Sequence, residues 1–259
     1  MNKLRIFLFV LIVIGIILLC TQNFWVPQLV DKILSFESSD KDTIISPQKS
    51  EKPAKAEAPV SIATREIKEK NFTGTVPVIS GTSSLEVKMR EYVEGELAKF
   101  KKQADEEVPD LRERFGSEGP TASYEISIYS KYIKSEKTKS IVTHVIFYTG
   151  GAHPWTIYKV FTADNISGKI LQLSYIIRQD KRGAFVEFVK KNLGEWRIED
   201  EYPATFPESV KDLTFESFSN WSLDDKNLTI YFDQYDIGPG ALGPVAFPIQ
   251  LDKIRDYLQ

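Results

Sequence analysis

Two histidines and two late aspartates are the residues of this 259-residue sequence whose types could support general acid–base chemistry. His144 and His153 are the only histidines in the chain. Imidazole exchanges protons near neutral pH, and a carboxylate such as Asp233 or Asp236 could assist it. One hypothesis is therefore an envelope polymer hydrolase with His153 as its catalytic residue.

The same residues do not predict a metal site or another catalytic centre. The two histidines and the aspartates lack the short ligand spacing that is typical of zinc sites. A G-x-S-x-G motif and a phosphate-binding glycine loop are also absent from the sequence. The simpler interpretation makes His144 a sheet residue and His153 a turn residue bonded to backbone groups. We expect no cofactor and, more readily than an enzyme, a binding protein.

Two glycine-rich segments are the best candidates for ligand contact. The first is Tyr-Thr-Gly-Gly-Ala-His-Pro-Trp at 148–155, where paired glycines permit a tight turn that presents His153 and Trp155. The second, at 235–244, is rich in glycine and proline. Its tyrosine and Trp155 could stack on sugar rings, although burial is the commoner fate of aromatic residues. The predicted ligand-binding residues are Tyr148, Gly150, Gly151, His153, Trp155, Tyr235 and Asp236.

Strands and helices are expected to position these segments. Alternating or β-branched residues predict strands at 124–128, 141–148, 156–162, 213–221, 228–232 and 245–249, after an extended piece at 66–79. Ser83 and Glu86 have the spacing of a capping box before an apolar helical stripe. A second helix is predicted at 182–193 with Gly194 as its C-cap, and a short helix at 251–258. The fold class is α+β, a mainly antiparallel sheet with two packed helices.

An uncharged segment at 6–26 predicts a membrane-spanning helix. Lys3 and Arg5 precede it, so the positive-inside rule places residues 1–5 in the cytoplasm and the rest outside. A cleaved signal peptide and a lipid anchor on Cys20 are the alternatives. Because Cys20 is the only cysteine, no disulfide can form within the chain.

The predicted organisation follows from these segments. A polar linker is expected at 27–65. One folded domain is expected at 66–259, and it could consist of two lobes, 66–135 and 136–259. The formal net charge is −3, so no basic field favours nucleic acid as a partner. The expected protein is single-pass, with its C-terminal domain outside the cell membrane.

Three motifs resemble a known family of bacterial extracytoplasmic domains. They are Pro-Val-Ile-Ser-Gly at 77–81, Tyr-Thr-Gly-Gly-Ala-His at 148–153, and Tyr235, Ile237, Pro239, Gly243 and Pro244 in the late loop. The chain is similar here to the paired domains DUF4163 and DUF3298. These domains occur in the RsiV anti-sigma factor and beside the catalytic domain of PdaC-type peptidoglycan deacetylases. The resemblance covers about residues 66–259.

The resemblance implies a binding or sensor domain of the cell envelope. In RsiV such a domain binds lysozyme, and beside deacetylases it is expected to assist contact with peptidoglycan. Only residues 1–5 would remain in the cytoplasm, and no catalytic domain follows Gln259 in this sequence. We therefore expect the binding portion alone, with a cell-wall component or a lysozyme-like protein as partner. The alternatives are the His153 hydrolase and a structural envelope protein.

Overall fold

A mixed sheet occupies the first half of the computed structural model, which describes residues 60–116, 124–198 and 202–259. Within these ranges seven strands form it, in the order β2-β3-β4-β5-β6-β7, with β1 also paired to β4. Its elements are β1 (Val60–Ser61), β2 (Thr64–Lys68), β3 (Phe72–Pro77), α3 (Ser84–Phe115), β4 (Tyr124–Lys134), β5 (Thr138–Tyr148), β6 (Trp155–Asp164) and β7 (Ile170–Leu171). All pairs are antiparallel except β3 with β4, which α3 connects as a crossover.

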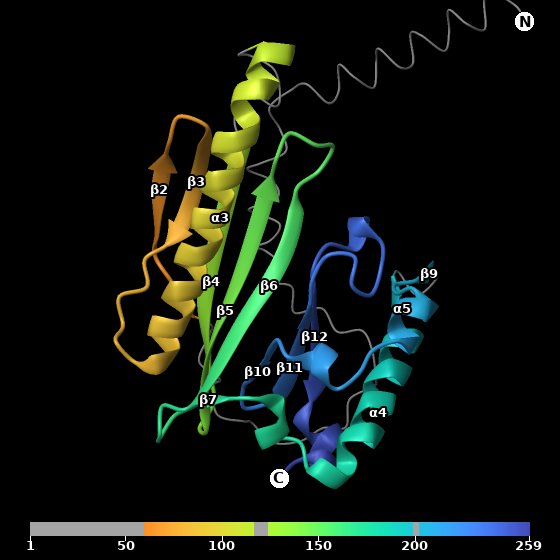
Figure 1. Cartoon of the computed structure of the whole chain (residues 1–259). Coiled ribbons are helices and arrows are strands. Elements are labelled where there is room, and N and C mark those ends of the chain that lie inside the picture. The colour runs from red at the N-terminus through yellow and green to blue at the C-terminus, as the bar shows by residue number, and fades with distance from the viewer. Residues whose placement is uncertain (1–59, 117–123, 199–201) are drawn as a thin grey trace, which may run out of the picture. The chain divides into compact units, whose positions relative to one another are not determined.

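Helix α3 crosses one face of this sheet (Figure 1). Its apolar side chains recur at helical spacing and are buried against the sheet, so amphipathic patterning determines which face of the helix packs. The predicted capping box is only half right. Ser83 is the N-cap, but its hydroxyl donates to the Glu86 carboxylate and not to a helix N–H. The buried residues of the stripe are Leu85, Met89, Val93, Phe100, Ala104 and Val108.

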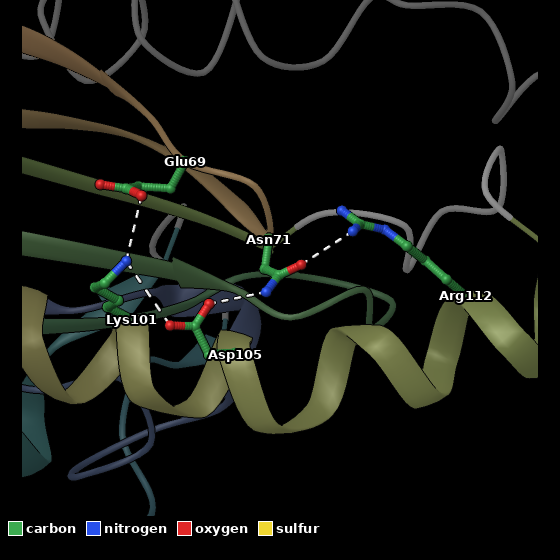
Figure 2. Close-up of polar contacts among 5 residues, drawn as sticks. All are labelled: Glu69, Asn71, Lys101, Asp105 and Arg112. Carbon is green, nitrogen blue, oxygen red and sulfur yellow. Dashed lines mark hydrogen bonds and ion pairs between the residues drawn. The ribbon is translucent and has the colours of Figure 1, made fainter.

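Polar contacts attach the β2–β3 turn to α3 (Figure 2). The amide of the buried Asn71 donates to Asp105 at 2.8 Å and accepts from Arg112 at 3.0 Å. Lys101 lies between Glu69 and Asp105, with its ammonium 3.2 and 3.7 Å from their carboxylates. Because a buried amide needs such partners, this cluster holds the turn beside the helix.

A second, smaller sheet has the order β10-β11-β12 and packs with α4 around a separate hydrophobic core. The elements of this half are the 3₁₀ helices η1 (Leu173–Tyr175) and η2 (Gln179–Lys181), α4 (Arg182–Glu195), β8 (Arg197–Ile198), β9 (Tyr202–Pro203), α5 (Pro207–Lys211), η3 (Glu216–Phe218), β10 (Trp221–Leu223), β11 (Asn227–Phe232), η4 (Gly240–Leu242), β12 (Val245–Gln250) and η5 (Leu251–Tyr257). The α+β class with mainly antiparallel strands is thus confirmed.

Two local predictions in this half are wrong. The predicted strand 213–221 is mostly η3 and loop, because Phe218 turns into the core and contacts the rings of Phe185 and Phe232. Gly194 is not the C-cap of α4, which ends at Glu195 and has Trp196 as its C-cap. The predicted short closing helix is present as the 3₁₀ helix η5. Tertiary burial of one aromatic ring overrides β propensity in the first case.

The domain borders also differ from the sequence-based ones. Strands begin at Val60, ahead of the expected start at residue 66. A border between 135 and 136 would divide the β4–β5 hairpin, whereas the two hydrophobic cores divide near residue 171. The predicted span 6–26 lies outside the described residues. Within the described ranges no helix has the length and apolar character needed to cross a bilayer.

Candidate functional site

The β5–β6 connection presents one exposed aromatic side chain. Trp155 is 56% exposed and lies against Phe147, with ring centroids 5.9 Å apart. Gly150 has φ +82°, the left-handed conformation that glycine adopts without strain. Gly151 has no such requirement, because a Cβ there would approach only the His153 carbonyl, at 4.0 Å. The first glycine of the predicted pair therefore forms the turn.

The loop after β11 presents a second exposed aromatic side chain. Tyr235 is 54% exposed and has φ +75°, an unusual conformation for a residue with a Cβ. Its ring lies directly over Gly240, where a Cβ would come within 2.4 Å of ring atoms. Close approach to a glycine thus fixes the position of this ring.

Gln234 joins the two loops. Its Oε1 accepts from the backbone N–H of Thr156 at 3.0 Å, and its own N–H donates to the Thr156 carbonyl at 3.1 Å. Its Nε2 donates to the Gly240 carbonyl at 2.9 Å. Since Thr156 follows Trp155 and Gln234 precedes Tyr235, the structure brings the two predicted loops together at the start of β6.

The two aspartates of the hydrolase hypothesis are engaged with backbone groups. Asp233 Oδ1 accepts from the Tyr158 N–H at 2.6 Å, and Asp236 Oδ2 accepts from the Asp233 N–H at 2.8 Å. Burial raises the pKa of Asp233, against the opposing effect of the hydrogen bond from Tyr158. Both carboxylates therefore have structural roles at the β6 edge.

His153 and His144 lie in different environments. His153 is exposed, and no hydrogen bond or ion pair links it to Asp233, Asp236 or any other described residue. The backbone hydrogen bond expected for its imidazole is likewise not formed. His144 lies beside the Tyr158 ring, 5.0 Å between centroids, and its buried Nε2 has no partner among the described residues. Burial, with a contribution from Lys131, lowers the His144 pKa to about 4.

The remaining predicted residue, Tyr148, is half-buried at the end of β5, opposite Glu125 of β4. Trp155 pairs with Phe147, the neighbouring residue, so Tyr148 and Trp155 point to opposite faces of the sheet. The structure therefore does not place all seven predicted residues on one surface. Within the described ranges, no group of three metal-ligating side chains could hold a metal ion.

Sequence reasoning missed the side chains that close the free edge of β6. Asn220 accepts from the Val160 N–H at 3.1 Å and donates to the Tyr158 carbonyl at 3.2 Å. Together with Asp233 and Gln234 it satisfies the backbone of a strand that no other strand covers there. A polar residue next to a strand was the only available signal, and it is too common to interpret.

Two family models and one curated protein are similar to this chain in sequence. Residues 64–156 match the family model described as Deacetylase PdaC, and residues 174–252 match that of a protein of unknown function, DUF3298. The chain is 24% identical over 199 residues to the peptidoglycan-N-acetylmuramic acid deacetylase PdaC of Bacillus subtilis. That alignment covers 73% of this chain but 39% of the relative, so the chain spans well under half of it.

Two solved structures have a similar fold. A DUF3298 family member from Bacteroides fragilis matches with a TM-score of 0.51 and 20% identity, covering 78% of this chain and 94% of that one. A DUF3298 family protein from Pseudomonas aeruginosa matches with a TM-score of 0.51 and 14% identity, covering 80% and 95%. The expected DUF3298 relationship is confirmed, while the DUF4163 and RsiV-like parts of the resemblance stay predictions.

Proposed function

We propose that this chain, whose residues 174–252 match the DUF3298 family, is a binding or sensor domain of the bacterial cell envelope. In this proposal residues 6–26 anchor it in the cell membrane and the C-terminal domain faces the wall. The relationship to PdaC, whose name states an action on peptidoglycan, supports a wall-associated role. The deacetylase activity itself is not carried over, because the alignment covers 39% of that relative.

The observation that carries the proposal is the pair of exposed aromatic rings on the two joined loops. Trp155 is supported by Phe147, and Tyr235 is supported by Gly240. Gln234 bonds to both loops, so neither ring has to be ordered when a ligand arrives. Preorganised aromatic surfaces suit sugar rings, and this favours a glycan of the wall over a lysozyme-like protein as the ligand.

The test is binding of the full chain to solubilised peptidoglycan fragments and, in parallel, to lysozyme. Trp155→Ala should weaken binding at least about tenfold, as loss of an aromatic anchor does, and leave the free energy of unfolding within about 0.5 kcal/mol. Phe115→Ala is the matched control, because Phe115 is an aromatic residue of α3 that is 66% exposed and belongs to neither loop. Unchanged affinity of a folded Trp155→Ala protein for its ligand would remove this loop from the proposal.

Lysozyme binding without glycan binding would make the partner a protein. Binding to neither would leave the envelope role without a ligand and favour the structural alternative.

A further inference from the structure

Strand β2 has an unpaired edge. Val78 donates to the Ala63 carbonyl at 2.7 Å and Glu69 donates to that of Phe72 at 2.9 Å, so the odd-numbered residues of β2 bond to β3. Antiparallel ladders alternate, and the backbone groups of Thr64, Glu66 and Lys68 therefore point away from the sheet. Among the described residues these outward N–H and C=O groups have no partner.

Three other edges among the described residues carry some protection. Side chains of Asn220, Asp233 and Gln234 cap β6, as described above. The hydroxyls of Thr138 and Thr162 donate to the outward carbonyls of β10. Strand β12 has Pro248 at an outward position, where no N–H exists to donate. An edge of five residues without such protection is a template for strand pairing.

We propose that β2 pairs with β2 of a second copy of this chain, antiparallel, about a two-fold axis at Ile67. Only outward-facing residues can bond to each other, so the axis must pass through a residue position. An axis at Glu66 would place Glu66 opposite itself, and axes at Arg65 or Lys68 would likewise oppose like charges. An axis at Ile67 avoids this.

The Ile67 register is also complementary in charge. It places Glu66 opposite Lys68 of the second copy, and Arg65 opposite Glu69 of the second copy, each twice by symmetry. All four charged side chains are exposed, and Ile67 meets its own equivalent at the centre. Opposite charges directly across strands stabilise a pair, and no other register forms these two pairs. The second copy is therefore the occupant that the charges favour.

The first test is a register-specific disulfide in the full chain with Cys20→Ser. Ile67 would occupy a non-hydrogen-bonded pair, where Cα atoms lie about 4.5 Å apart, within the range of a disulfide. Ile67→Cys should yield a covalent dimer on mild oxidation. Arg65→Cys is the matched control, because its two copies would lie four residues apart, about 13 Å. Equal cross-linking of both variants, or none of Ile67→Cys, overturns the proposal.

The second test exchanges the charges and measures the dimer dissociation constant of the full chain in detergent by sedimentation velocity. Lys68→Glu and Glu66→Lys should each weaken association about tenfold or more, and the double variant should restore it to within about threefold. Lys102→Glu on α3 is the control, with its side chain 77% exposed. A protein that stays monomeric, or whose association ignores the single changes or is not restored by the double one, overturns the proposal.

Discussion

The two faces of the seven-stranded sheet differ in their proportions of apolar and hydrogen-bonded contacts. On one face α3 contributes apolar side chains, and Phe100 makes ring contacts with Phe72, Tyr124 and Phe147. On the other face a small apolar cluster of Val142, Val160 and Tyr231 is accompanied by hydrogen bonds to the second sheet, such as Thr162 to the Trp221 carbonyl at 2.8 Å. Apolar packing is non-directional, whereas hydrogen bonds require each partner in place. The larger apolar cluster lies on the first face, and the hydrogen bonds of the second face include those of Gln234 that join the two loops.

Phe100→Ala should disrupt the apolar packing between α3 and the sheet, and it should have the largest effect on stability. Removing a buried phenylalanine costs about 3–5 kcal/mol of unfolding free energy, from lost burial and the cavity left behind. Urea denaturation of the full chain measures this. Phe115→Ala on the same helix is the control, since that side chain is exposed and should change stability little. Equal losses in both variants would contradict the assignment of the core.

Glu86 is a buried polar residue on the α3 side, and removal of its charge should have the second-largest effect on stability. Burial alone would raise its pKa, but hydrogen bonds from Lys139 and Ser83 and the Lys139 charge lower it to about 2. Glu86→Gln should cost about 2 kcal/mol at neutral pH. Because the folded pKa is depressed, wild-type stabilisation is complete above about pH 4.5 and disappears as the pH falls through about 2.

Urea titrations of wild type and Glu86→Gln at several pH values measure this difference. The two curves should converge near pH 2, and the exposed Glu91→Gln on the same helix should follow wild type throughout. Parallel curves down to pH 2 would show that the Glu86 charge does not stabilise the fold.

Asn220→Ala tests the hydrogen-bonded face. The change leaves the Val160 N–H and the Tyr158 carbonyl without their partner, at a cost of about 1.5 kcal/mol. Hydrogen exchange should also speed up at Val160 more than at residues of the α3 face. The exposed neighbour Ser219→Ala is the control. Unchanged exchange at Val160 would mean that the edge does not depend on this cap.

The smallest predicted effect concerns His144 on the second face, where titration of the imidazole should make the free energy of unfolding depend on pH. Its folded pKa of about 4 lies below the ordinary 6.5, so the fold favours the neutral imidazole. Stability is unaffected above about pH 6.5 and falls as the pH drops towards 4, by about 1 kcal/mol at pH 5.5. His144→Gln should remove this part of the slope in urea titrations. A slope that remains after the substitution would have to come from other groups.

The hairpins and the main helices could be predicted because their information is local. Alternation in β4, β5 and β6 and the stripe from Leu85 to Val108 are visible in short windows of sequence. The strand predicted at 213–221 failed because Phe218 is held by contacts distant in sequence. The two glycine-rich loops were also recognised by local composition, and His153 and Trp155, the residues expected to be presented by the first loop, are exposed.

By itself the sequence determined the α+β class, the order of the main elements and the two loops that carry Trp155 and Tyr235. Only the tertiary structure decided that Gln234 joins these loops, that Asp233 and Asp236 bond to backbone groups, and that the β2 edge is left open. Periodicity and turn chemistry act over a few residues, whereas the contacts of Gln234 and Asp233 with β6 join residues 78 and 75 positions apart along the chain. Their partners are selected by folding, and no local pattern records them.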